Sequence, residues 1–169
     1  MSEDWQIRGA CQADAAQIAW LAGVLGYPGE THAMDERLGE LLGRPDHRIA
    51  VAAGRHGHLG GWLHVARHVP LESGAFAEIL GLVVDPQVRR AGLGRALVAE
   101  AERWAALHHL ARLAVRSNVM RSESHAFYPS LGFTRSKSQH VYAKLLGEAV
   151  PGSQAGAGAG CASPPGGVA

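Results

Sequence analysis

The residue types best suited to chemistry lie in one stretch, where an apolar segment over residues 78–84 leads into a turn rich in arginine and glycine. In that turn Arg89, Gly92 and Gly94 have the spacing R-x-x-G-x-G, and a helical pattern begins at the glycines. A helix start presents unpaired N–H groups and the positive end of the helix dipole, which together favour a phosphate. A glycine has no Cβ, so the backbone here can come close to a pyrophosphate. The stretch predicts a site for a phosphate-bearing ligand; the alternative is a helix start with solvated arginines.

Two other phosphate-binding motifs are absent from the sequence. The spacing G-x-x-x-x-G-K followed by Ser or Thr does not occur, because Arg95 follows Gly94. No first strand leads into G-x-G-x-x-G with an acidic residue about 20 positions later, so a dinucleotide-binding fold is not expected.

The elements that must position this stretch can be read from apolar periodicity and turn residues. Helices are expected after Asp14 up to Gly26 and over residues 31–42, 92–107 and 122–128, the last ending at Pro129. Strands are expected over residues 5–10, 48–53, 59–69, 78–84, 112–116 and 139–145. This order predicts an α/β or α+β fold with a mixed sheet and helices on both faces. We expect one domain over residues 1–147 and a disordered tail rich in Gly, Ala and Pro over residues 148–169.

Composition excludes several functional classes. The 16 basic and 15 acidic residues give a net charge of +1, which argues against nonspecific nucleic-acid binding. No apolar run approaches the roughly 20 residues that span a bilayer, so no membrane role is expected. The two cysteines lie near opposite ends of the chain, which excludes a disulfide framework and favours a cytoplasmic location. The ten histidines form no set with Cys or carboxylates at zinc spacing, so no metal is expected.

Two segments together resemble a known family. Arg89-x-x-Gly92-x-Gly94 is similar to the Q/R-x-x-G-x-G/A signature of the GNAT superfamily of N-acetyltransferases. Downstream, Asn118 closes a predicted strand, and Phe127-Tyr128-x-x-Leu131-Gly132-Phe133 is similar to the second half of that family. The resemblance covers residues 5–145 in element order and residues 78–133 in detail. It implies a mostly antiparallel sheet with a V-shaped splay between the fourth and fifth strands.

The resemblance also implies acetyl-CoA as cosubstrate. Its pantetheine arm would enter the splay and pair with the backbone of Leu82, Val83 and Val84, with Gly81 marking a bulge that drives the splay. Asn118 would bond a pantetheine amide or cap the following helix. The pyrophosphate would be held at the helix start by Arg89, Arg90, Ala91, Gly92, Leu93, Gly94 and Arg95.

The implied reaction is direct attack of an amine on the thioester, which requires a base, an oxyanion donor and an acid. The backbone N–H of Leu82 or Val83 could bind the oxyanion. Tyr128 matches the family tyrosine and could protonate the thiolate, although Pro129 directly after it could shift the phenol. Glu78 is the candidate base; on a regular strand it would share one face with Leu80, Leu82 and Val84. The alternatives are that Glu78 pairs with an arginine, or that His64 or His125 is the base.

The resemblance further implies that the acceptor pocket comes from the N-terminal half of the chain. Tyr27 to Met34 would form a lid, with Tyr27, His64 and Glu78 contacting the substrate. The substrate is expected to be a primary amine on a small molecule; a protein lysine or N-terminus, or a non-catalytic acyl-CoA-binding role, remains open. The predicted strand over residues 139–145 could pair across a two-fold axis in a homodimer.

Overall fold

The structure, a computed structural model, describes residues 4–24, 26–27, 29–88, 91–118 and 122–146. The chain divides into two units, Met1–Thr134 and Arg135–Ala169. All described helices and strands lie in the first unit. In the second unit, the described residues 135–146 form neither helix nor strand.

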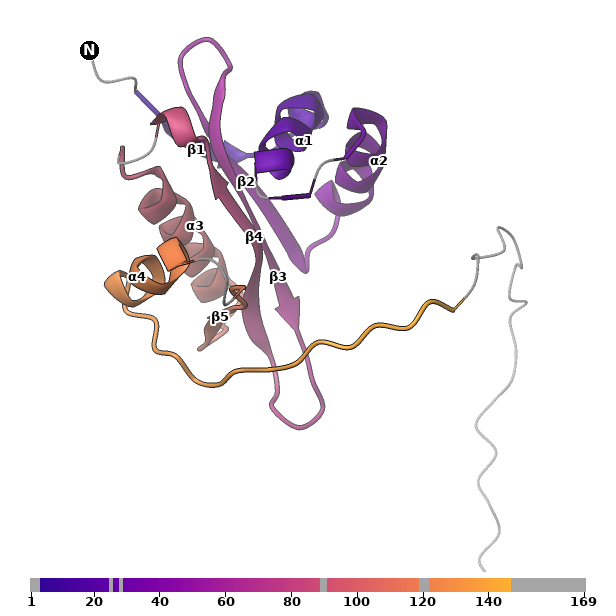
Figure 1. Ribbon diagram of the computed structural model, residues 1–169, viewed down its shortest axis with the longest axis vertical. Helices are drawn as coiled ribbons and strands as arrows, with labels where there is room; N and C mark the ends of the chain where they lie inside the picture. The colour runs from indigo at the N-terminus through magenta and orange to yellow at the C-terminus, as the bar shows by residue number, and fades with distance from the viewer. Residues whose placement is uncertain (1–3, 25, 28, 89–90, 119–121, 147–169) are drawn as a thin grey trace, which may run out of the picture. The chain divides into compact units, whose positions relative to one another are not determined.

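A five-stranded sheet forms the centre of the first unit (Figure 1). Its strands follow chain order, and every neighbouring pair is antiparallel except the last, which is parallel. The strands are β1 (Gln6–Gly9), β2 (His47–Ala53), β3 (Leu59–His68), β4 (Phe76–Val84) and β5 (Leu113–Val115). The expectation of a mixed, mostly antiparallel sheet is confirmed.

Helices cover both faces of this sheet (Figure 1). On one face lie α1 (Ala15–Val24) and α2 (Thr31–Leu42), and on the other α3 (Leu93–Leu107) and α4 (Ser122–Ser130). Two 3-10 turns, η1 (Gln12–Asp14) and η2 (Pro86–Val88), precede α1 and α3. The core is accordingly in two parts, one under α3 with Leu63, Ile79 and Leu97, and one under α1 and α2 with Leu21, Leu38 and Val51. Burial of these apolar side chains is what holds the helices on the sheet.

The sheet splays between β4 and β5. Only three residue pairs join the two strands, Ala77–Leu113, Glu78–Ala114 and Ile79–Val115, whereas β4 continues to Val84. A bulge begins at the same point, because His64 of β3 pairs with Gly81 while Val65 pairs with Ile79, which leaves Leu80 as an extra residue on β4. A bulge bends its strand and increases the local twist, and so directs the end of β4 away from β5.

Two sequence-based expectations differ from the structure. The strand predicted over residues 139–145 is wrong: this segment is irregular, and Val141, Tyr142 and Leu145 are exposed. A strand needs a neighbouring strand for its backbone hydrogen bonds, which a favourable composition cannot supply. Pro129 does not end α4, which continues one residue beyond it to Ser130. The predicted tail over residues 148–169 lies outside the described residues.

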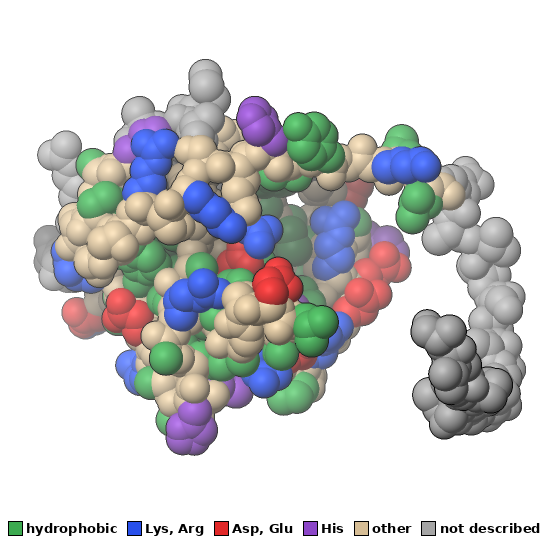
Figure 2. Space-filling view, turned by 90° about the horizontal axis from the view of Figure 1, so that it is seen from below, with side chains coloured by type: hydrophobic (Ala, Val, Ile, Leu, Met, Phe, Trp, Pro, Cys, Tyr) green, Lys and Arg blue, Asp and Glu red, His purple; other side chains and the backbone are tan. Residues whose placement is uncertain are grey.

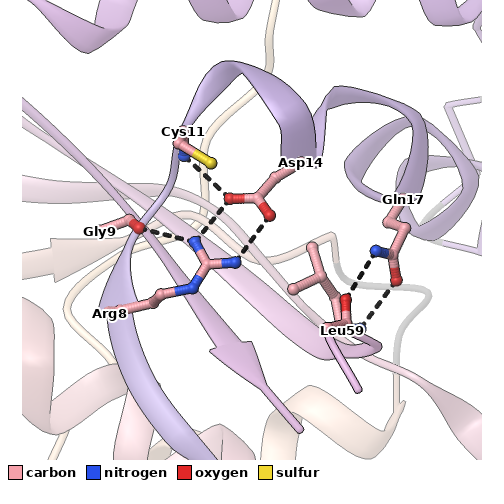
Figure 3. A network of polar contacts seen from close by, with 7 residues as sticks. Arg8, Gly9, Cys11, Asp14, Gln17 and Leu59 are labelled. Atoms are coloured by element: carbon pink, nitrogen blue, oxygen red, sulfur yellow. Dashed lines mark hydrogen bonds and ion pairs between the residues drawn. The ribbon is translucent and has the colours of Figure 1, made fainter. Parts of the chain in front are cut away.

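An ion pair between half-buried Arg8 and buried Asp14 fixes the start of α1 against the first strand (Figure 3). Asp14, which directly precedes α1, accepts hydrogen bonds from Arg8 at 2.7 and 2.8 Å and from the backbone N–H of Cys11 at 2.9 Å. One turn later, Gln17 bonds the carbonyl of Gly57 and the N–H of Leu59, both at 2.9 Å, which ties α1 to the β2–β3 turn. The hydrogen bonds from Arg8 lower the pKa of the Asp14 carboxyl.

Asp14→Asn is expected to lower the free energy of unfolding by about 1–3 kcal/mol near pH 7, because it removes charge-assisted hydrogen bonds to a buried group. The folded-state pKa of Asp14 lies below its unfolded value. The Asp14 carboxylate therefore contributes to the free energy of unfolding above the unfolded pKa, and this contribution is lost as the pH falls through the folded pKa. Urea unfolding of both proteins between pH 7 and pH 3 tests this. A constant difference across that range would contradict it.

Candidate active site

The start of α3 has the backbone geometry expected of a phosphate site. Gly92 precedes the helix with φ +78° and ψ 3°, a left-handed conformation that side chains with a Cβ rarely adopt. No side chain of the described residues caps this position, and the first turn, residues 93–96, carries no acidic residue. The first N–H groups of a helix have no partner within it, so those after Gly92 can receive an anion. Ala91 and Arg95 are exposed, Leu93 is buried, and the predicted Arg89 and Arg90 lie outside the described residues.

Gly94 allows α4 to pack against this helix start. A Cβ at Gly94 would lie 3.0 Å from the Phe127 ring, so only glycine fits without displacing that ring. The next residue of α4, the candidate acid Tyr128, is half-buried and makes edge-on ring contacts with Phe127 and Phe133 at 5.1 and 5.5 Å between centroids. Asn118, the candidate pantetheine contact, is exposed three residues beyond β5. The contact between α3 and α4 therefore places the candidate acid on a helix that touches the candidate phosphate site.

The residues predicted to contact pantetheine lie at the end of β4. Leu82, Val83 and Val84 pair with β3 on one side, and the ladder to β5 ends before them, at Ile79. Leu82 and Val84 pack into the core under α3, and Val83 packs into the core under α1 and α2. An extended ligand on the β5 side could thus bond the backbone here in the manner of an added strand.

Glu78 lies on β4 within the three residues that still pair with β5. Its neighbours Ala77 and Ile79 belong to the core under α3, so Glu78 points to the other face, that of α1 and α2. The expectation that Glu78 shares a face with Leu80, Leu82 and Val84 is wrong, because the bulge at Leu80 inverts the alternation beyond it.

The Glu78 carboxylate is buried and asymmetrically paired. Its side chain is 3% exposed, its Oε1 lies 3.0 Å from Nε of Arg116, and its Oε2 lies 3.5 Å from Nε2 of His68. Oε2 of Glu78, Nε2 of His68 and Nε1 of Trp62 are buried and make no hydrogen bond with any residue that the structure describes. Buried polar atoms in this state carry a free-energy cost that a bound ligand or water can relieve. Glu78 therefore pairs with an arginine, the alternative weighed above, through one of its two carboxylate oxygens.

His64 and His47 form a hydrogen-bonded pair on the same face of the sheet. Nε2 of His64 lies 2.9 Å from Nδ1 of His47. Burial, with a smaller contribution from His47, lowers the pKa of His64 to about 4, and burial also lowers the pKa of His47. His64 is consequently neutral at pH 7 and a weaker proton acceptor than an ordinary histidine. The other rival, His125, is exposed on α4.

Below pH 6.5 the His64 imidazole is expected to reduce stability. Its folded-state pKa, about 4, lies below the unfolded value of about 6.5, so between these values the unfolded chain binds the extra proton and stability falls with the pH. His64→Gln is expected to reduce the slope of unfolding free energy against pH in this window relative to the original protein. Parallel slopes for the two proteins in chemical denaturation would contradict the assignment.

Tyr27 lies in the connection between α1 and α2 and is 70% exposed. Its backbone N–H donates to the carbonyl of Ala22 at 3.0 Å, which fixes the turn that follows α1. The predicted lid, Tyr27 to Met34, includes the first turn of α2, and Met34 packs into the core beneath that helix.

Residues at both ends of β5 complete the surroundings of Glu78, and the sequence reasoning did not assign them a role. Arg112 places its guanidinium 4.1 Å above the Phe76 ring, and Arg116 pairs with Glu78. On β3, His68 stacks on the same Phe76 ring at 5.6 Å between centroids. The alternating pattern of residues 112–116 could have identified these two arginines, because it places them at both ends of one strand face.

A surface groove of about 460 Å³ lies elsewhere, between β2 and α3. The acidic residue that lines this groove, Glu100, forms ion pairs with both Arg48 and Arg103. Among the described residues no group of three or more His, Cys, Asp or Glu could hold a metal ion, and none of the described helices is long and apolar enough to cross a membrane.

Comparison with known proteins identifies the family. The model of the Acetyltransferase (GNAT) family matches residues 14–133. The chain belongs to the GNAT acetyltransferase family. The match includes β4, the start of α3 and α4, and ends at Phe133, before the irregular segment. A search of curated proteins found no match.

Solved structures share this GNAT fold at low sequence identity. Aminoglycoside N-acetyltransferase AAC(6')-Iy in complex with CoA has a TM-score of 0.77 and 18% identity, over 85% of this chain and 97% of that one. Aminoglycoside 6'-N-acetyltransferase AAC(6')-IG from Acinetobacter haemolyticus has a TM-score of 0.73 and 21% identity, over 83% and 99%. Glucosamine-6-phosphate N-acetyltransferase from Arabidopsis thaliana has a TM-score of 0.74 and 22% identity, over 83% and 99%.

Proposed function

We propose that the protein transfers an acetyl group from acetyl-CoA to the primary amine of a small molecule. One observation carries this proposal: the splay between β4 and β5 has the buried carboxylate of Glu78 near its apex and leads toward the uncapped start of α3. A thioester lying in the splay would thus be close to a proton acceptor, while its diphosphate is bound by backbone N–H groups.

The residues present fit acetyl-CoA. The left-handed Gly92 turns the first N–H groups of α3 outward, and Arg95 adds an exposed positive charge. The unpaired side of Leu82–Val84 is suited to the amides of an extended chain, with Asn118 as a further donor or acceptor. By sequence, Arg89 and Arg90 add two more cations at the turn.

The reaction requires three acts from these side chains and backbone groups. Glu78 takes a proton from the acceptor ammonium, directly or through water, so that the neutral nitrogen can attack the thioester carbon. The backbone N–H of Leu82 or Val83 donates to the carbonyl oxygen as it becomes an oxyanion. As the carbon–sulfur bond breaks, Tyr128 donates its phenolic proton to the sulfur, leaving CoA thiol and an acetamide. The nitrogen gives its second proton to the Tyr128 phenolate, directly or through water, which restores the phenol, and Glu78 releases to solvent the proton it took.

The choice of a small acceptor is supported by what the structural neighbours act on, which are aminoglycosides and glucosamine 6-phosphate. We place the reaction in the cytoplasm, since the two cysteines lie far apart in sequence. We also propose that the chain can form homodimers.

Two measurements on the full-length protein test the function. Acetyl-CoA at 100 times its dissociation constant is expected to stabilise the fold by about 2.7 kcal/mol, seen as a rise in melting temperature. Free thiol, detected with a disulfide reagent, is expected only when a small amine is added. Binding without thiol release for any amine would indicate a non-catalytic module, and release only with lysine peptides would indicate a protein acetyltransferase.

A further inference from the structure

We propose that the acceptor is an amine that also carries an acid group, a carboxylate or phosphate, and that Arg112 and Arg116 bind this acid group. The inference deepens the proposed function and rests on it. It comes from the surroundings of Glu78 on the face of the sheet that carries α1 and α2.

The cross-strand neighbours of Glu78 on both sides are small residues. Its register partners are Ala66 on β3 and Ala114 on β5, and cross-strand partners share one face of the sheet. Both are alanines, so no large side chain stands beside the carboxylate along this row. We call the area over Glu78, Ala66 and Ala114 the basin.

Cationic side chains stand at the β5 side of the basin. Arg112 and Arg116 lie two residues before and after Ala114, and their contacts with Phe76 and Glu78 place both guanidiniums on the basin face. The carbonyl of Arg112 accepts a hydrogen bond from Ala77 at 2.9 Å, which continues the ladder and fixes the backbone of Arg112. Phe76 and Glu78, which the two guanidiniums contact, are two residues and about 7 Å apart on β4, so one small ligand can lie between the two guanidiniums.

Charge favours an acid group over a second amine. The two guanidiniums exceed the single carboxylate of Glu78 by one positive charge, and on β3 the basin is bordered by imidazoles, His64 and His68, rather than carboxylates. The Arg116 side chain is 74% exposed and contacts Glu78 through Nε, so a guanidinium with five donors retains capacity for a ligand. An acceptor with several ammonium groups would meet like charges here, which is unfavourable.

Orphaned polar atoms point to a ligand in the same place. Oε2 of Glu78 and Nε2 of His68 lie 3.5 Å apart, and both are buried without a hydrogen bond to any described residue. The Glu78 side chain is 3% exposed. An acceptor ammonium can donate to Oε2 while its acid group is held by Arg112 and Arg116. Figure 2, which looks from below at the end of the molecule with the β3–β4 connection, shows Lys and Arg side chains close to Asp and Glu side chains.

Matched acceptors test the inference. We would compare kcat/KM for glucosamine 6-phosphate against glucosamine, and for an α-amino acid against its carboxamide, with kanamycin as a polycationic probe. The original protein is expected to prefer the acid-bearing member of at least one pair by tenfold or more. The two pairs distinguish a phosphate from a carboxylate as the group bound.

Variants test whether residues of the basin cause the preference for acid-bearing amines. Arg112→Gln is expected to reduce the preference for the acid-bearing amine about tenfold, with little change in kcat/KM for the uncharged amine of the pair. Arg112→Lys is expected to retain part of the preference. Arg67→Gln is the control, because Arg67 lies on β3 between Ala66 and His68 and points to the opposite face. Melting temperatures verify that each variant is folded, and the preference of the original protein tests the inference even if Arg112→Gln does not fold.

The outcomes distinguish a failure of the acid-group inference from a failure of the proposed function. Acetylation of uncharged or polycationic amines without preference for the acid-bearing ones would overturn the inference and leave the proposed function intact. An equal loss for both members of a pair in Arg112→Gln would also overturn it. No acetylation of any amine would overturn the proposed function, and the inference with it.

Discussion

Glu78→Gln is expected to lower kcat/KM for amine acetylation by about 10²–10⁴, the usual contribution of a positioned general base. The amide keeps the shape of the side chain but cannot take a proton from the acceptor ammonium. Amines with a pKa near that of lysine are almost fully protonated at pH 7, so the reaction then depends on the small neutral fraction. Activity of the variant is therefore expected to recover as the pH is raised toward 10.

Acetyl-CoA affinity separates this role from a structural one. It is expected to be unchanged in Glu78→Gln, because the phosphate site at α3 and the edge of β4 are not altered. Glu102→Gln is the matched control, because Glu102 is an exposed glutamate on α3. Its substitution should change neither kcat/KM nor the affinity for acetyl-CoA. Near-normal turnover of Glu78→Gln at pH 7 would exclude Glu78 as the base and favour His64 or His125.

Gly61→Ala is expected to give the largest loss of stability, about 3 kcal/mol, at the upper end of the usual cost of overpacking. A Cβ at this position of β3 would lie 2.5 Å from the carbonyl oxygen of Val83. That oxygen belongs to the backbone of β4 and cannot rotate away, so the two strands must separate next to the proposed pantetheine contacts. Acetyl-CoA affinity should fall together with stability.

Gly23→Ala provides a control of opposite sign. Gly23 lies inside α1, and a Cβ there would meet no atom within 4 Å. Alanine is more favourable than glycine within a helix by about 1 kcal/mol, so this variant is expected to be slightly more stable. Urea unfolding of both variants measures the difference. Equal stability of the two would show that the close approach of β3 and β4 at Gly61 is unimportant.

Sequence reasoning predicted best where one periodic pattern decided an element. The stripe of Leu93, Leu97, Ala101 and Trp104 predicted α3, and all four are buried. The bounds of α2 were predicted correctly as residues 31–42, because a turn rich in Gly and Pro precedes the helix and Pro45 follows it. In such cases local signals and tertiary packing agree.

The sequence was less informative wherever the outcome depended on a partner strand. Gly81 suggested a bulge, but the inverted alternation beyond Leu80 follows from the pairing of β4 with β3, which composition does not reveal. The pairing of Glu78 with Arg116 likewise depends on the parallel register of β4 and β5. The predicted strand over residues 139–145 was wrong for a related reason, since apolar alternation does not create a neighbouring strand.

Backbone amide NMR during a titration with CoA tests the central claim most directly. The account predicts the largest chemical-shift changes at Leu82–Val84 and at Ala91–Arg95, the two backbone segments proposed to bind the pantetheine arm and the diphosphate. Amides of the groove between β2 and α3, such as that of Glu100, should change little. Saturating CoA that leaves both segments unperturbed, or perturbs only residues outside them, would contradict the account.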